Sequence, residues 1–221
     1  MTTVHTKRLQ RLHESDEVAV DRAIHVLGMS AGALGSAALV WIALNQQNQS
    51  GEWWPIMVYS ACLMAMLCCS AAYNFSVSRS RREILRRVDH AAIFLLIAGT
   101  YTPFTARMLP EKWSFWMTGL IWASSLAGAL LKLGCPHRLE RVNLALYLAL
   151  GWVIVVAWKP LLTAIDLETA FLILSGGILY TIGAIFHAWH DLRFQNAIWH
   201  AFVLIAAGCH YAAVLRTVRL G

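Results

Sequence analysis

The sequence predicts an all-α fold, a polytopic membrane protein in which seven transmembrane helices form one bundle. Of its 221 residues, 58% are hydrophobic and 14% are charged, whereas about 25% of the residues in a soluble domain are charged. The mean hydropathy is +0.56. The apolar residues gather in seven segments, each close to the roughly 20 residues that a helix needs to cross the hydrocarbon core. Lipid, rather than water, is therefore the expected main solvent of this chain.

The apolar segments follow one another with short polar connections. In chain order they are 20–44, 54–76, 88–108, 114–131, 141–158, 167–188 and 197–216. Residues 1–19 are polar, and we expect them to form a cytosolic N-terminal segment ahead of a single transmembrane domain at 20–216. They contain no apolar stretch, so no cleavable signal peptide is expected.

Turn residues or charges separate the segments and justify each boundary. The breaks are the Asn- and Gln-rich run 45–51, the Arg-rich run 79–87, Leu109-Pro110-Glu111-Lys112, Gly134-Cys135-Pro136-His137, Lys159-Pro160 and Asp191-Leu192-Arg193. Within the first segment, Gly28, Gly32 and Gly35 place small residues along one helix and indicate close helix packing.

The distribution of Lys and Arg predicts the orientation. If the seven segments alternate in direction, 13 of the 18 basic residues fall on the side of the N-terminus. The remaining five are Arg107, Lys112, Lys159, Arg216 and Arg219. Short, positively charged loops stay in the cytosol, so we expect the N-terminus inside and the C-terminus outside.

The net charge of +6 does not indicate a nucleic-acid partner. The basic residues lie in short runs between apolar segments, which is a pattern of membrane topology. Membrane lipids are the expected partners, and the pattern leaves the oligomeric state open.

Polar residues gather at the segment ends that this orientation places near the cytosol. Ser70 and Asn74 lie four residues apart, as do Asn196 and His200, so each pair projects from one helix face. Asp89 opens the third segment. His25 and His187 point to the same layer. Polar side chains are costly inside a membrane and are expected to converge on a functional site or on a structural hydrogen-bond network.

Several ordered motifs resemble the hemolysin III family, the bacterial branch of the progestin and adiponectin receptor superfamily. The resemblance runs from Asp21 to Leu215. The motifs that carry it are Asp21–Gly28, Ser70–Asn74, Arg87–Phe104 and Ala197–Val203 followed by His210. It implies seven transmembrane helices, a cytosolic N-terminus and an intramembrane zinc site made by three histidines near a serine and an aspartate. The chain is also distantly similar to alkaline ceramidases, whose metal activates water to cleave a lipid amide.

The sequence departs from the family at two of the three implied zinc ligands. Asn74 and Asn196 stand at those positions, and only His200 remains. An amide oxygen is a poor zinc ligand compared with imidazole. The polar residues are then expected to form a metal-free hydrogen-bond network, unless His187, His190 or Asp191 supplies a replacement ligand.

Three functions remain open at this point. The sequence favours a non-enzymatic hemolysin III-like protein of the bacterial cytoplasmic (inner) membrane, acting in membrane or lipid homeostasis or in pore formation, with a polar site degraded from a zinc site. The alternative is a metal-dependent hydrolase of lipid amides or esters, in which Ser70 and Asp89 would be catalytic and His200 would hold zinc. A receptor or transporter is the third, although the chain shows no clear inverted repeat.

Overall fold

The computed structural model describes residues 2–45, 53–134 and 140–220, and its elements are all helical. In chain order they are α1 (Thr2–Asn45), α2 (Trp54–Phe75), α3 (Arg79–Met108), α4 (Glu111–Gly134), α5 (Glu140–Gly151), the 3-10 helix η1 (Val153–Ala157), α6 (Trp158–Leu162), α7 (Leu167–Ala188) and α8 (Gln195–Leu220). The all-α prediction is confirmed. The predicted breaks at 46–51 and 135–137 lie outside the described residues.

Six helical stretches are long and apolar enough to cross a membrane. They are Ser15–Asn45, Trp54–Phe75, Glu111–Gly134, Val142–Leu162, Leu167–Ala188 and Gln195–Val218. The seventh predicted span lies in α3, whose apolar part is interrupted by Asp89 and by the polar run 100–102. α3 packs against α2, α4, α5 and α8, so more of its surface faces protein than lipid.

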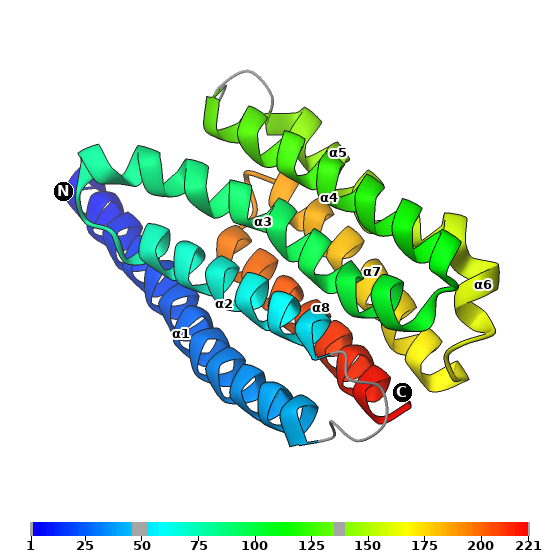
Figure 1. Ribbon diagram of the computed structural model, residues 1–221. Helices are drawn as coiled ribbons and strands as arrows, with labels where there is room; N and C mark the ends of the chain where they lie inside the picture. Colours follow the sequence, from blue (N-terminus) through cyan, green and yellow to red (C-terminus); the bar gives the residue numbers. More distant parts are fainter. Residues whose placement is uncertain (1, 46–52, 135–139, 221) are drawn as a thin grey trace.

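The helices form a closed ring. Each helix contacts the next one around the ring. The successive pairs are α1 with α2, α2 with α3, α3 with α4, α4 with α5, α5 with α7, α7 with α8 and α8 with α1. α1 begins at one end of the bundle and α8 ends at the other (Figure 1), as an odd number of crossings requires. The end at which α2 passes into α3 and α7 passes into α8 is called the α2–α3 end below.

Two helix boundaries differ from the prediction. α3 begins at Arg79 rather than at 88, because its Arg-rich first turns are helical although they are too polar to resemble a membrane span. Lys132 lies inside α4 rather than in a loop, and its side chain is 2% exposed. A charged residue lowers the hydropathy of a segment without ending its helix, so hydropathy alone misplaces such boundaries.

The fifth span is broken in the middle. α5 ends at Gly151, and η1 and α6 complete the crossing to Leu162. The Tyr101 hydroxyl on α3 lies 2.9 Å from the Leu150 carbonyl oxygen and 2.8 Å from that of Gly151, and it accepts from the Ile154 backbone N–H at 2.8 Å. An irregular backbone at membrane depth needs such partners, since lipid offers none.

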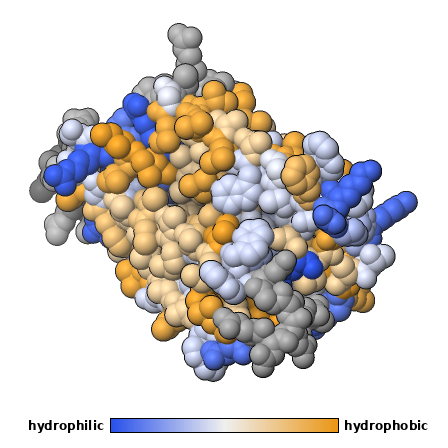
Figure 2. Space-filling view, in the orientation of Figure 1, coloured by the Kyte–Doolittle hydropathy of each residue, from blue (hydrophilic) through white to orange (hydrophobic). Residues whose placement is uncertain are grey.

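Large hydrophobic side chains are exposed on the outer surface of the bundle. Leu34, Phe115 and Phe171 are 74%, 71% and 68% exposed. Figure 2 shows hydrophobic residues over most of this face and hydrophilic residues gathered toward its margins. Such a surface is stable only in contact with lipid, which agrees with the predicted membrane location.

The glycines of α1 allow close approach to two neighbours. A Cβ atom at Gly32 would lie 2.3 Å from Leu67 on α2, and one at Gly35 would lie 3.1 Å from the Tyr211 ring on α8. The Tyr211 hydroxyl also donates to the Gly35 carbonyl at 2.9 Å. The packing role predicted for these small residues is thereby confirmed.

Candidate functional site

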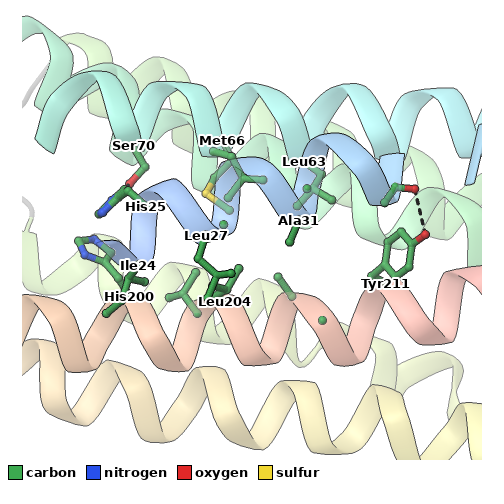
Figure 3. Close-up of a pocket in the computed structure, with 17 residues that line it drawn as sticks. Ile24, His25, Leu27, Ala31, Leu63, Met66, Ser70, His200, Leu204 and Tyr211 are labelled. Carbon is green, nitrogen blue, oxygen red and sulfur yellow. Dashed lines mark hydrogen bonds between the residues drawn. The ribbon is translucent and has the colours of Figure 1, made fainter. Parts of the chain in front are cut away.

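A buried polar cluster lies toward the α2–α3 end, where α1, α2, α3 and α8 meet. Its residues are Asp21 and His25 on α1, Ser70 and Asn74 on α2, Asp89 on α3 and His200 on α8. Each pair on α1 and α2 is spaced four residues apart, which places both side chains on one helix face. Figure 3 shows His25, Ser70 and His200 at one end of a groove, with their polar atoms close together.

His25 is the centre of the hydrogen bonds in this cluster. Its Nδ1 lies 2.8 Å from the Asp21 backbone carbonyl, an acceptor, so Nδ1 carries the proton. Its Nε2 then carries the lone pair, and it lies 3.2 Å from the Ser70 hydroxyl and 3.0 Å from the Asn74 amide nitrogen. Asn74 also donates to the Ser70 carbonyl at 2.9 Å. α1 and α2 thus fix the tautomer and the orientation of this imidazole.

His200 reaches the same place from α8. Its Nδ1 lies 2.6 Å from the Asp21 carboxylate, across 179 residues of sequence. The rings of His25 and His200 pack edge to face, with centroids 4.4 Å apart. A proton on His200 Nδ1 satisfies the carboxylate and leaves Nε2 with its lone pair, so Asp21 orients His200 as well as supporting His25.

Asp89 completes the cluster from α3. Its side chain is buried and hydrogen-bonds to the Ser70 hydroxyl. Ser70 therefore lies between Asp89 and His25, and its single hydroxyl proton is available to Asp89 because Asn74 also donates to His25 Nε2. A buried carboxylate is stable only with such partners, and here they come from a neighbouring helix.

The structure brings together five of the seven predicted site residues, namely Ser70, Asn74, Asp89, His25 and His200. The other two lie nearer the α7–α8 junction. Asn196 is exposed, and His187 packs against the Trp199 ring with centroids 4.9 Å apart. Of the two pairs predicted from spacing, Ser70 and Asn74 both lie in the cluster, whereas on α8 only His200 reaches it.

Asp21 is the member of the cluster that the sequence prediction omitted. It precedes His25 by four residues, the same spacing that singled out the pairs on α2 and α8. A carboxylate just inside the first apolar segment is itself an unusual feature. That signal could have identified it, whereas its partner His200 could not be inferred from local spacing.

The residues present fit a divalent metal ion such as zinc. One ligand atom each from Asp21, His25 and His200 lies within 4.8 Å of the others. Two imidazoles and a carboxylate form the donor set of zinc sites that leave a coordination position open. His187, His190 and Asp191 were the replacement ligands considered from sequence. Among the described residues, the three possible ligands that lie this close together are instead on α1 and α8.

Two cavities meet at the cluster. A cavity of about 370 Å³ inside the bundle is lined by polar residues, among them Asn74, Asp89, His187 and Asn196. A groove of about 460 Å³ lies between α1, α2 and α8, and His25 lines it. Ser70 and His200 line both. The cluster therefore forms the wall between an interior cavity and a lateral groove.

A ring of long apolar helices around a buried His, Asp and Ser cluster defines a class of polytopic helical membrane proteins with a polar site inside the bundle. Comparison with known families identifies the particular group. The chain belongs to the family described as Haemolysin-III related, which matches residues 18–211. The resemblance drawn from the motifs is thereby confirmed.

Individual relatives agree with this assignment. The chain is 31% identical to the hemolysin-3 homolog of Bacillus subtilis over 184 residues, which cover 82% of this chain and 86% of that protein. It is 41% identical to hemolysin-3 of Bacillus cereus over 128 residues, 58% of each chain. A more distant match is the human monocyte to macrophage differentiation factor, 24% identical over 206 residues, with 90% and 83% covered.

Proposed function

We propose that this hemolysin III-like protein acts in lipid homeostasis of a bacterial cytoplasmic membrane, and that it binds the polar part of a membrane lipid at the cluster without hydrolysing it. One observation carries the proposal. A hydrogen-bonded cluster lies between two cavities inside an otherwise apolar bundle. The relatives from Bacillus support a bacterial membrane.

The chemistry of the cluster suits a lipid carbonyl or hydroxyl. The Ser70 hydroxyl can donate to a ligand, because Asn74 already donates to His25 Nε2, while Asp21 and Asp89 are acceptors. All four are held by protein partners, so a ligand would meet groups that are already oriented. Preorganised polar groups in an apolar site give orientation and selectivity, and the apolar walls supply most of the affinity.

Complementation of a deletion strain tests this function. We expect His200→Ala and Asp89→Ala to leave the membrane lipid composition of the deletion strain uncorrected, while Thr163→Ala, at an exposed position, restores it. Lipid mass spectrometry of isolated membranes is the measurement. Full correction by both cluster variants would overturn the proposal, as would ion leakage from protein-containing liposomes without any retained lipid.

A second candidate is a metal-dependent hydrolase of lipid amides or esters, which the proximity of Asp21, His25 and His200 favours. A zinc ion bound there would lower the pKa of a water molecule towards about 7. The chain itself would contribute the Ser70 hydroxyl as a donor to the lipid carbonyl and the Asp89 carboxylate as an acceptor that orients polar groups.

Metal analysis decides between the two candidates. We expect a hydrolase to retain about one zinc per chain by plasma mass spectrometry, to lose it in His25→Ala and His200→Ala, and to keep it in Asn74→Ala, because the amide is not a good ligand. Zinc in the wild type together with turnover of a ceramide in liposomes would establish the hydrolase. Absence of both would leave the non-enzymatic function.

A further inference from the structure

The groove between α1, α2 and α8 has features that the proposed function does not use. Its walls are almost wholly apolar along its length, with Gly28, Ala31 and Gly32 on one side and Leu204 and Ala207 on the other. Figure 3 shows it running from His25, Ser70 and His200 past Leu27 and Leu204 to Tyr211. It therefore has a polar end, an apolar middle and a defined far end.

The far end is closed by the hydrogen bond from Tyr211 to Gly35, which Figure 3 marks with a dashed line. From His25 to Gly35 the groove follows ten residues of α1, or about 15 Å at about 1.5 Å per residue. This is half of the roughly 30 Å hydrocarbon thickness of a bilayer. The groove is thus about as long as one leaflet, which is the depth that a single acyl chain occupies.

The groove is open toward the membrane. Leu27, which lines it, is 61% exposed, and Gly208 on the α8 side is also exposed. At Gly208 an added Cβ atom would meet nothing within 4 Å. Unfilled space of about 460 Å³ between packed helices forfeits dispersion contacts, and apolar walls disfavour water. Hydrocarbon from the bilayer is the medium available to fill it.

We infer that this groove is an acyl-chain site, in which one chain of a bilayer lipid lies along α1 with its carbonyl end at Ser70, His25 and His200. The lipid enters sideways through the opening between α1 and α8, and its headgroup side faces the interior cavity that shares Ser70 and His200 with the groove. This inference rests on the proposed lipid-binding function and specifies which part of the lipid binds where.

Photo-crosslinking tests the position of the chain. The full-length protein is placed in phosphatidylglycerol vesicles containing a phosphatidylglycerol with a diazirine at the end of one acyl chain or, separately, close to its carbonyl. We expect the terminal diazirine to label Tyr211 and Ala207 and the carbonyl-proximal one to label Ile24, as read by peptide mass spectrometry. Labelling spread evenly over outer residues such as Leu34, Phe115 and Phe171 would overturn the inference, since it would indicate ordinary boundary lipid.

A matched pair of variants tests occupancy of the groove. Gly208→Phe fills the open space, and Gly119→Phe on α4 makes the same change at another exposed helical glycine whose Cβ would also meet nothing within 4 Å. We expect Gly208→Phe to reduce groove labelling several-fold and Gly119→Phe to leave it unchanged, with equal thermal stability of the two variants as the folding check. Equal labelling in all three proteins would refute the groove as the site.

The two proposals fail in different ways. If the carbonyl-proximal probe labels Ile97 or Leu148, which line the interior cavity, and the Gly208→Phe variant still binds lipid normally, the lipid function stands and the groove inference is wrong. If the purified protein retains no lipid and neither probe gives a specific label, the proposed function fails with it.

Discussion

At the scale of single residues, His25 brings a second imidazole into a cluster in which position 74 carries asparagine. Its Nδ1 proton is committed to the Asp21 carbonyl, so its Nε2 lone pair faces Ser70 and Asn74. The imidazole that Asn74 lacks is thus supplied from the neighbouring helix. The asparagine at position 74 donates to this lone pair, which satisfies His25 without a metal.

Replacing Asn74 by histidine should strengthen metal binding. The change places a third imidazole beside His25, because the Asn74 amide nitrogen lies 3.0 Å from His25 Nε2. Three nitrogen donors with a nearby carboxylate suit zinc better than two. We expect more zinc per purified chain in Asn74→His than in the wild type, measured by plasma mass spectrometry. Asn74→Gln, which keeps an amide, is the control, and no gain over that control would contradict the assignment.

Asp21 should support zinc binding through His200, whether or not its own carboxylate is a ligand. Its carboxylate holds His200 through Nδ1 at 2.6 Å and so aims the other ring nitrogen into the cluster. Removing such an orienting partner typically weakens metal binding by about 10- to 100-fold. We expect Asp21→Asn to weaken zinc binding in a chelator competition titration to this extent. Asp191→Asn, at an exposed carboxylate, should behave as wild type, and if it shows the same loss, the effect is not specific to the cluster.

The sequence could predict only part of this cluster. Helical spacing identifies Ser70 with Asn74 because four residues bring side chains onto one face. The same rule covers Asp21 with His25 but cannot show that Asp21 meets His200, since that contact joins the first and last helices. Pairing between distant helices depends on how the ring closes, and no local pattern encodes that closure.

At the scale of helices, the broken fifth span depends on α3. The Tyr101 hydroxyl is the protein partner of the Leu150 and Gly151 carbonyls and of the Ile154 N–H. We expect Tyr101→Phe to destabilise the protein by about 1–3 kcal/mol, because buried backbone groups would lose their partner. Thermal unfolding in detergent is the measurement. Tyr73→Phe, which keeps the ring beneath the Arg82 guanidinium, is the control. A loss no larger than that of the control would show that the backbone finds other partners.

An ion pair joins α7 to α8 at the other end of the bundle. Asp166, the N-cap of α7, accepts from the Thr169 backbone N–H at 2.9 Å and pairs with Arg216. The hydrogen bond from Arg216, with those from Thr169, holds the pKa of the Asp166 carboxyl below its ordinary value. A lowered carboxyl pKa means stabilisation that is complete above the unfolded pKa of about 3.9 and is lost as pH falls towards the folded pKa.

Asp166→Asn should therefore lower the Tm modestly at neutral pH, because the variant cannot form the ion pair with Arg216. The difference from wild type should narrow as the pH is lowered below about 4, because the carboxyl then takes up a proton in the unfolded chain while it stays ionised in the folded protein. Thermal unfolding across a pH series checks this. A constant difference at all pH values would show that the loss does not come from the ionised carboxyl, and the amide oxygen of asparagine, which still caps the helix, rules out lost capping as its cause.

At the scale of the whole molecule, hydropathy locates the apolar segments but does not give the residues at which every helix begins and ends. The predicted segment 167–188 coincides with α7, because its apolar run begins and ends at polar residues. α3 is longer than predicted, since the helix begins in the charged run at Arg79, ahead of the apolar segment. Apolar length reports the thickness of the membrane, whereas helix length also depends on propensity outside it.

The orientation of the bundle remains a prediction that labelling can check. Ser78, between α2 and α3, and Thr163, between α6 and α7, are exposed and lie at opposite ends of the bundle. Thirteen of the 18 basic residues fall on the side of Ser78, so electrostatic retention favours that side in the cytosol. In a background without the five native cysteines, we expect a membrane-impermeant maleimide to label Thr163→Cys in intact cells and Ser78→Cys only after the membrane is opened. The reverse pattern would place the polar cluster near the outer face, and the lipid carbonyl in the groove would then belong to the outer leaflet.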